Sequence, residues 1–171
     1  FLKKMLKFTS IEYSKAEAQY KESKTAEELD YFGDEKYRWE NNTHFLCPAM
    51  SLVSLYMLVE KSLKNLCYSF SENSTSWYVE KGVRFKVPKS NKESNIDASL
   101  KYLLNTKKFK FTIPQDLEDI LERIRVLRND FAHGDWENVE KTIKRIDVDK
   151  CFEAVSDLFF SIEDGMEETA S

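Results

Sequence analysis

The stretch Ala49–Phe70, AMSLVSLYMLVEKSLKNLCYSF, carries the clearest structural signal in this chain. Its hydrophobic residues recur at steps of three and four, which is the spacing of one side of an α-helix. They form one wide apolar stripe: Leu52, Val53, Tyr56, Val59, Leu63, Leu66 and Phe70. We therefore expect a long helix whose stripe faces a core, with Pro48 starting or kinking that helix.

Helical patterns also lie on both sides of this stretch. Towards the N-terminus, a first helix is expected from Thr9 or Ser10 to Tyr31, with Gly33 as its stop. A second segment, from Asp34 to Pro48, would lead into the long helix. Towards the C-terminus, four further helices are expected, over residues 97–105, 114–133, 136–145 and 148–162.

The composition supports the same fold class. The chain has 171 residues, which fits one domain, and it contains only 4 Gly and 3 Pro. Because hairpins and tight turns need these residues, an all-β fold is disfavoured, and no glycine cluster is present to form a phosphate-binding loop. We predict a single all-α domain over residues 1–171, an up-and-down bundle of about five or six helices. Residues 1–33 would be a helical extension, and residues 71–95 a basic insertion that forms a loop or a small hairpin.

Charge is divided unevenly along the chain. Residues 81–111 hold nine basic and two acidic side chains, whereas residues 147–171 hold one basic and eight acidic ones. The first segment could attract a polyanion such as RNA. The simpler interpretation is that both segments are solvated surfaces that keep the protein soluble.

The cysteines and histidines do not suggest a metal site. Cys47, Cys67 and Cys151 are widely spaced among apolar neighbours, and we expect them to be buried free thiols in a reducing compartment. Together with His44 and His133 they supply few ligands, so we expect no metal and no cofactor. The longest apolar stretch, from Cys47 to Val59, is shorter than a membrane span, and we expect a cytoplasmic protein without a membrane partner.

One segment combines residues that can do chemistry. It runs from Ile124 to Trp136, IRVLRNDFAHGDW, at the end of the helix that follows Pro114. This helix has its own apolar stripe: Leu117, Ile120, Leu121, Ile124, Leu127 and Phe131. On a helical wheel Arg128 lies within roughly 40° of the centre of that stripe, where a guanidinium needs a partner, an interface or a cleft. A structural explanation is that Glu60 pairs with Arg128 and that His133 merely caps the helix.

The run Arg128-Asn129-Asp130-Phe131-Ala132-His133 resembles the R-(N/D/H)-x3–5-H signature of HEPN domains, small all-α bundles found in many bacterial ribonucleases. The position of the run also fits, since it is late in the chain and ends an amphipathic helix. Residues 54–64, SLYMLVEKSLK, are similar to the long early helix of such domains. Two features depart from the family: Asp135 replaces a tyrosine seen in some members, and the basic insertion is large.

The resemblance implies a metal-independent endoribonuclease that acts as a homodimer, with both motif copies at the subunit interface. His133 would supply acid–base catalysis, Arg128 would bind phosphate oxygens, and Asn129 and Asp130 would orient the reacting groups. The residues expected to bind the RNA backbone are Lys81, Arg84, Lys86, Lys89 and Arg125.

The same resemblance implies a toxin or phage-defence setting, in which an antitoxin or another regulatory protein is a further partner. The alternative is a non-catalytic HEPN-like module that binds a protein or a nucleotide, with Arg128 and His133 in structural roles.

Overall fold

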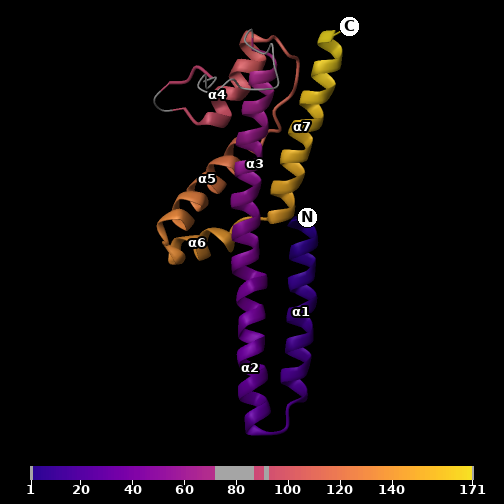
Figure 1. Cartoon of the computed structure of the whole chain (residues 1–171), viewed down its shortest axis with the longest axis vertical. Helices are drawn as coiled ribbons and strands as arrows, with labels where there is room; N and C mark the ends of the chain where they lie inside the picture. Colours follow the sequence, from indigo (N-terminus) through magenta and orange to yellow (C-terminus); the bar gives the residue numbers. More distant parts are fainter. Residues whose placement is uncertain (1, 72–86, 91–92, 171) are drawn as a thin grey trace, which may run out of the picture. The chain divides into compact units, whose positions relative to one another are not determined.

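The computed structural model describes residues 2–71, 87–90 and 93–170, and its regular structure is entirely helical (Figure 1). The α-helices are α1 (Leu2–Glu22), α2 (Ala26–Asn41), α3 (Cys47–Ser69), α4 (Asn95–Lys101), α5 (Leu117–His133), α6 (Trp136–Ile143) and α7 (Val148–Ala170). Two π-helical segments, η1 (Asn42–Leu46) and η2 (Tyr102–Thr106), continue α2 into α3 and extend α4. The described residues thus form six continuous helices, which confirms the all-α bundle. Most of the basic insertion, expected to be a loop or hairpin, lies outside them.

The chain divides into two compact units. The first unit comprises Phe1–Ser54 and Glu122–Val148, and the second comprises Leu55–Leu121 and Asp149–Ser171. The boundaries fall inside α3, inside α5 and after the first residue of α7, so α3 and α5 each supply several residues to both units. Each unit is described below by itself.

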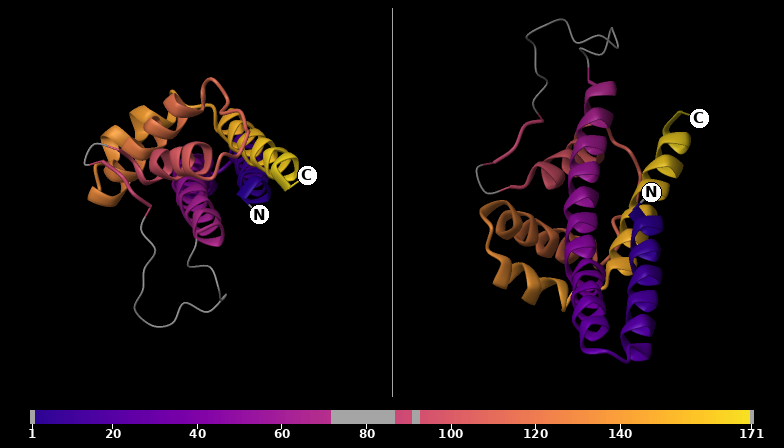
Figure 2. Two further views of the ribbon diagram at one scale, coloured as in Figure 1. Left: turned by 90° about the horizontal axis from the view of Figure 1, so that it is seen from above. Right: turned by 60° about the horizontal axis from the view of Figure 1, so that its bottom comes forward.

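In the first unit, α1 and α2 form an antiparallel hairpin whose two helices lie side by side (Figures 1 and 2). The expected first helix, which ended at Tyr31, is wrong, because the chain breaks after Glu22 and restarts at Ala26. The break is set by a capping box: Thr25 Oγ1 accepts from the Glu28 amide at 3.2 Å, and Glu28 Oε2 accepts from the Thr25 amide at 3.2 Å. Gly33, expected to stop the helix, lies inside α2 instead.

The π-helical segment η1 lets the chain pass Pro48 without a break. Proline has no amide proton, so it cannot donate an ordinary hydrogen bond inside an α-helix. Here Pro48 is the second residue of α3, directly after the π-helical turn. Pro48 was expected to start or kink the long helix, and it lies one residue after the first residue of α3, in a helix that continues from α2 through η1. The helix α3 itself is one to two residues from the expected bounds.

The second unit contains the larger apolar core. Residues of α3, α4, η2, α5 and α7 are buried there: Leu55, Tyr56, Val59, Leu63, Cys67, Ile96, Leu100, Leu103, Leu117, Leu121, Val155, Leu158 and Ile162. Phe70 and Phe109 add an edge-to-face ring contact with centroids 4.7 Å apart. The C-terminal helix α7 also reaches beyond Ile162, where the sequence analysis ended it.

The segment between η2 and α5 packs directly on α7. The Thr112 amide donates to Ser161 Oγ at 2.8 Å, and Gly165 lies four residues further along α7. A Cβ atom at Gly165 would overlap the carbonyl group of Lys110. Glycine at this position therefore allows a close approach between helix and loop that no other residue allows.

The three cysteines are free thiols, two of them buried. Cys67 Sγ donates to the Ser99 carbonyl at 3.5 Å, and burial raises the pKa of this thiol to about 11. Burial also raises the pKa of Cys47, which is half-buried rather than buried as expected. Both thiols are therefore less reactive than a solvent-exposed cysteine.

In the described part of the chain, one continuous helix, Ala26–Ser69, is long and apolar enough to cross a membrane. Of its most apolar window, 39% is buried inside the structure. A core helix of a soluble protein passes the same test, so this observation by itself is weak support for a membrane span.

Candidate functional site

The helix α5 presents the candidate catalytic residues. It begins after Pro114, whose carbonyl accepts from the Leu117 amide at 3.0 Å, and Glu118 and Asp119 occupy its first turn. Acidic residues stabilise a helix N-terminus by interacting with its dipole. Leu117, Leu121, Ile124 and Leu127 are buried, which confirms the apolar stripe expected from the sequence.

The C-terminus of α5 is closed by a Schellman motif. Gly134 has a φ of 71°, its amide donates to the Phe131 carbonyl at 3.3 Å, and the Asp135 amide donates to the Asp130 carbonyl at 2.9 Å. Asp135 is also the N-cap of α6, where its carboxylate accepts from the Asn138 amide. His133 is therefore fixed as the last residue of α5 by the backbone on both sides of it.

Aromatic contacts in the first unit hold this turn in place. The Trp136 ring meets Phe131 edge-to-face at 5.3 Å between centroids and Phe45 at 6.3 Å. Such pairs contribute about 0.5–1.5 kcal/mol beyond their buried area. The α5–α6 turn is thus attached to η1 as well as to its own helix.

The structure brings the candidate catalytic residues to the last two turns of α5. Arg128, Asn129 and His133 are exposed, and Asp130 is half-buried. Asn129 and His133 are one helical turn apart, so their side chains are neighbours on the same face. The last two turns of α5 therefore carry an amide, an imidazole and a guanidinium side chain.

The helical wheel overstated the apolar surroundings of Arg128. It placed the residue near the centre of the apolar stripe, but the residue is exposed. A wheel gives only the direction of the Cα–Cβ bond, and an arginine can lay its methylene groups along apolar surface while its guanidinium stays in water.

The candidate RNA-binding residues are only partly described. Lys81, Arg84 and Lys86 lie outside the described residues. Lys89 donates to Asn95 Oδ1 at 2.7 Å, and Arg125 forms a two-pronged ion pair with Glu122 at 2.6 and 2.7 Å. The Arg125 pair lowers the pKa of the Glu122 carboxyl and neutralises part of the positive charge on this face of α5.

Glu60, the expected structural partner of Arg128, accepts a hydrogen bond from Asn95 Nδ2 at 2.5 Å in the second unit. Arg128 belongs to the first unit, so the pairing of Glu60 with Arg128 stays a prediction. No group of three or more His, Cys, Asp or Glu side chains is placed to hold a metal ion within the residues that the structure describes.

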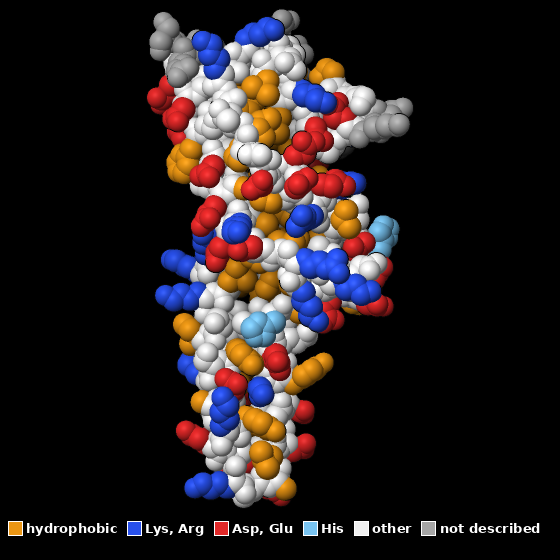
Figure 3. All heavy atoms as spheres, turned by 180° about the vertical axis from the view of Figure 1, so that it is seen from behind, with side chains coloured by type: hydrophobic (Ala, Val, Ile, Leu, Met, Phe, Trp, Pro, Cys, Tyr) orange, Lys and Arg blue, Asp and Glu red, His pale blue; other side chains and the backbone are white. Residues whose placement is uncertain are grey.

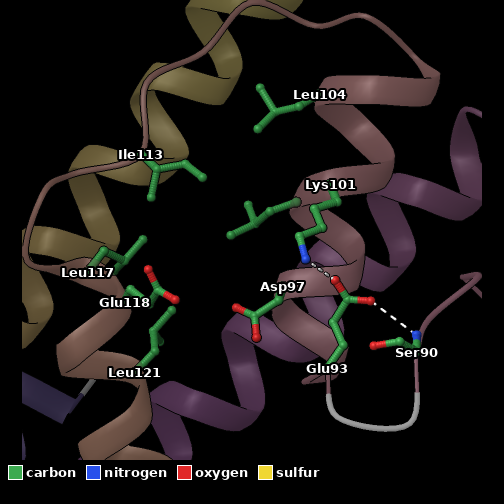
Figure 4. Close-up of a pocket in the computed structure, with 10 residues that line it drawn as sticks. Ser90, Glu93, Asp97, Lys101, Leu104, Ile113, Leu117, Glu118 and Leu121 are labelled. Carbon is green, nitrogen blue, oxygen red and sulfur yellow. Dashed lines mark hydrogen bonds and ion pairs between the residues drawn. The ribbon is translucent and has the colours of Figure 1, made fainter.

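A pocket of about 420 Å³, which was not predicted from the sequence, lies in the second unit (Figure 4). Its apolar wall consists of Leu100, Leu104, Ile113, Leu117 and Leu121, and its polar wall of Ser90, Glu93, Asp97, Lys101 and Glu118. The residues come from α4, η2, α5 and the segments before α4 and α5, so no local sequence pattern could reveal the cavity. The volume lies in the range that small-molecule sites occupy.

An ion pair between Lys101 and Glu93 defines the electrostatics of this pocket. The hydrogen bond from Lys101 lowers the pKa of Glu93, and the same bond raises the pKa of Lys101. The negative charges of Asp97 and Glu118 raise the pKa of Lys101 further, so the charges of three carboxylates act on one ammonium group.

Comparisons of the chain with protein-family models, with curated proteins and with solved structures gave no match.

Proposed function

We propose that this chain is a metal-independent endoribonuclease of the HEPN type, with Arg128, Asn129 and His133 as its reacting residues. The observation that carries the proposal is their joint exposure at the end of α5, where the Schellman motif fixes His133 as the terminal helical residue. A histidine and an arginine that served only the interior of the bundle would be covered by their own subunit.

The proposed reaction needs two kinds of group. The 2′-hydroxyl of a ribose attacks the neighbouring phosphate, the bond to the 5′-oxygen of the next nucleotide breaks, and a 2′,3′-cyclic phosphate and a 5′-hydroxyl remain. His133 transfers a proton between the attacking or leaving oxygen and solvent, an effect typically worth 10²–10⁴-fold in rate. Arg128 stabilises the added negative charge on the non-bridging oxygens through paired hydrogen bonds.

A second copy of the chain completes the proposed site. A pair of α5 ends, each with Arg128 and His133, supplies an acid and a base at once, which a single imidazole cannot do in one step. Asn129, on the His133 face, orients the imidazole or the phosphate, and Asp130 is the weaker candidate for this role. The biological setting that we propose is a toxin or phage-defence effector controlled by another protein.

The test is an RNA-cleavage assay in EDTA with the full chain and a His133→Ala variant. We expect the wild-type chain to cleave mixed RNA, and the variant to be roughly 10²–10⁴-fold slower. Polynucleotide kinase should phosphorylate the 5′ ends of the products without prior phosphatase treatment, because these ends are hydroxyls.

The matched control is His44→Ala, which removes the other histidine of the chain. His44 lies in η1, and its ring contacts that of Tyr13 in α1 edge-to-face with centroids 5.2 Å apart. This variant should cleave at the wild-type rate. If the wild-type chain does not cleave RNA, or if EDTA abolishes cleavage, the proposal is wrong and a non-catalytic binding module becomes the better interpretation.

A further inference from the structure

The pocket between α4 and the start of α5 combines a continuous apolar wall with an excess of negative charge (Figure 4). Leu100, Leu117 and Leu121 are buried, and Leu104 and Ile113 are partly exposed at the cavity. An apolar surface of this kind gains free energy when a hydrocarbon group displaces water from it. The wall therefore favours a ligand with an aliphatic or aromatic body.

The polar wall selects the charge of that ligand. Glu93, Asp97 and Glu118 face a single cation, Lys101, which leaves two negative charges in excess among the described lining residues. Glu93 is committed to Lys101, and one oxygen of Asp97 accepts from the Ser94 amide at 3.3 Å in the α4 capping box. Glu118 makes no hydrogen bond or ion pair within the part of the chain that the structure describes.

The two remaining carboxylates lie on facing walls. In Figure 4 the side chain of Asp97 extends from α4 towards the side of the pocket where Glu118 projects from α5. A protonated amine between them would receive charge-assisted hydrogen bonds, which are stronger than neutral ones. Its hydrocarbon part would then lie on the leucine wall.

From this arrangement we infer that the pocket binds an aliphatic amine, with the ammonium group between Asp97 and Glu118 and the hydrocarbon chain against Leu100, Leu104 and Leu117. A carboxylate or phosphate ligand is disfavoured because it would add negative charge next to three carboxylates. A neutral ligand of equal size would leave the two carboxylates uncompensated. The inference does not depend on the ribonuclease proposal, since it concerns another set of residues.

The experiment is an NMR titration of the full chain with three probes of equal carbon number: hexylamine, hexan-1-ol and hexanoate. We expect hexylamine to cause saturable chemical-shift changes in the lining residues. Hexan-1-ol should bind roughly tenfold more weakly than hexylamine or weaker still, and hexanoate should show no saturable binding. Binding of hexylamine should weaken as salt is added, because screening acts on the exposed Glu118 carboxylate.

Two variants locate the ammonium group. Glu118→Gln should weaken hexylamine binding roughly tenfold or more, because it removes one charged acceptor. Asp119→Asn is the matched control, since Asp119 is the neighbouring acid of the first turn of α5 and does not line the pocket. Hexylamine should bind this control as tightly as it binds the wild-type chain.

Leu104→Asn tests the apolar wall separately and should weaken hexylamine and hexan-1-ol alike. The inference is overturned if hexylamine shows no saturable binding, if hexan-1-ol binds as tightly, or if Glu118→Gln and Asp119→Asn behave in the same way.

Discussion

The α1–α2 hairpin and the second unit are both helical but differ sharply in how many apolar side chains they bury. Within the hairpin only Thr9 and Ala16 are buried, and α2 contributes no buried residue. The second unit buries apolar residues from α3, α4, α5 and α7. Apolar burial is the main driving force for folding. We therefore expect burial to contribute more to the free energy of folding in the second unit than in the hairpin.

Local aromatic contacts partly compensate for the small number of buried side chains in the hairpin. Its aromatic residues pair with neighbours, Phe8 with Trp39 at 6.1 Å and Tyr31 with Phe32 at 5.1 Å between ring centroids. Phe8 and Tyr31 are nevertheless exposed, and hydrophobic side chains on the hairpin alternate with charged ones on the face drawn in Figure 3. Regions with few buried contacts open at a lower free-energy cost than the core, so we expect the hairpin to open first.

The largest effect is expected from a cavity in the second unit. Leu63→Ala removes a side chain that is 0% exposed, and we expect a loss of about 2–5 kcal/mol in the free energy of unfolding. Urea unfolding followed by circular dichroism measures it. The control Leu58→Ala lies on the same helix but is 55% exposed, and its effect should stay within about 0.5 kcal/mol. Equal effects of the two variants would contradict the difference in burial on which the comparison rests.

A pair of glycine substitutions sharpens the comparison because the same change should have opposite signs in the two regions. Gly165→Ala forces a Cβ atom into the Lys110 carbonyl, and we expect a destabilisation of about 1–3 kcal/mol. Gly33→Ala adds a Cβ atom that lies 3.5 Å from the Tyr20 ring, which is an ordinary contact.

Alanine is a better helix former than glycine by about 1 kcal/mol, so Gly33→Ala should stabilise the hairpin. Thermal unfolding of the two variants beside the wild-type chain measures both effects. A stabilised Gly165→Ala variant would show that the close contact between α7 and Lys110 does not constrain the fold.

The fold class and most helices could be predicted from the sequence because periodic apolar stripes are local signals. The buried faces of α3 and α5 are the ones that their leucine and isoleucine spacing predicts, and α5 ends at His133, the last residue of the predicted range 114–133. The break between α1 and α2 was predicted too late in the chain, because Gly33 was taken as the stop signal. The signal that sets the break is the capping box at Thr25 and Glu28. A glycine is tolerated inside a helix, whereas a satisfied capping box defines where one begins.

The candidate site shows a similar division. The positions of Arg128, Asn129 and His133 at the end of α5 follow from the sequence, because they depend on one helix and its stop signal. The pocket near Glu118 does not, since it needs the packing of segments far apart in the chain. The exposure of Arg128 also could not be predicted from a helical wheel, because a wheel ignores the length and flexibility of the side chain.

The smallest expected effect tests the capping box that separates α1 from α2. Thr25→Ala removes the hydroxyl that accepts from the Glu28 amide, and we expect a loss of about 1 kcal/mol, confined to the hairpin. Hydrogen exchange of the amides in the first turn of α2 should become faster, while amides of α3 in the second unit keep their wild-type rates. The control is Ser14→Ala, whose hydroxyl donates to the Ser10 carbonyl inside α1 and caps nothing.

The same box predicts a pH dependence with a definite sign. Hydrogen bonds from the Lys24 and Thr25 amides lower the pKa of the Glu28 carboxyl below its ordinary value of 4.5. Its contribution to hairpin stability is therefore complete above pH 4.5 and is lost as the pH falls through the lowered pKa. Exchange at the start of α2 should accelerate on acidification in the wild-type chain after correction for the intrinsic rate, and Glu28→Gln should remove much of that dependence. If the wild-type chain and Glu28→Gln respond equally to acid, the carboxylate of Glu28 does not hold the start of α2, and the hairpin owes its break to the chain geometry of residues 23–25 alone.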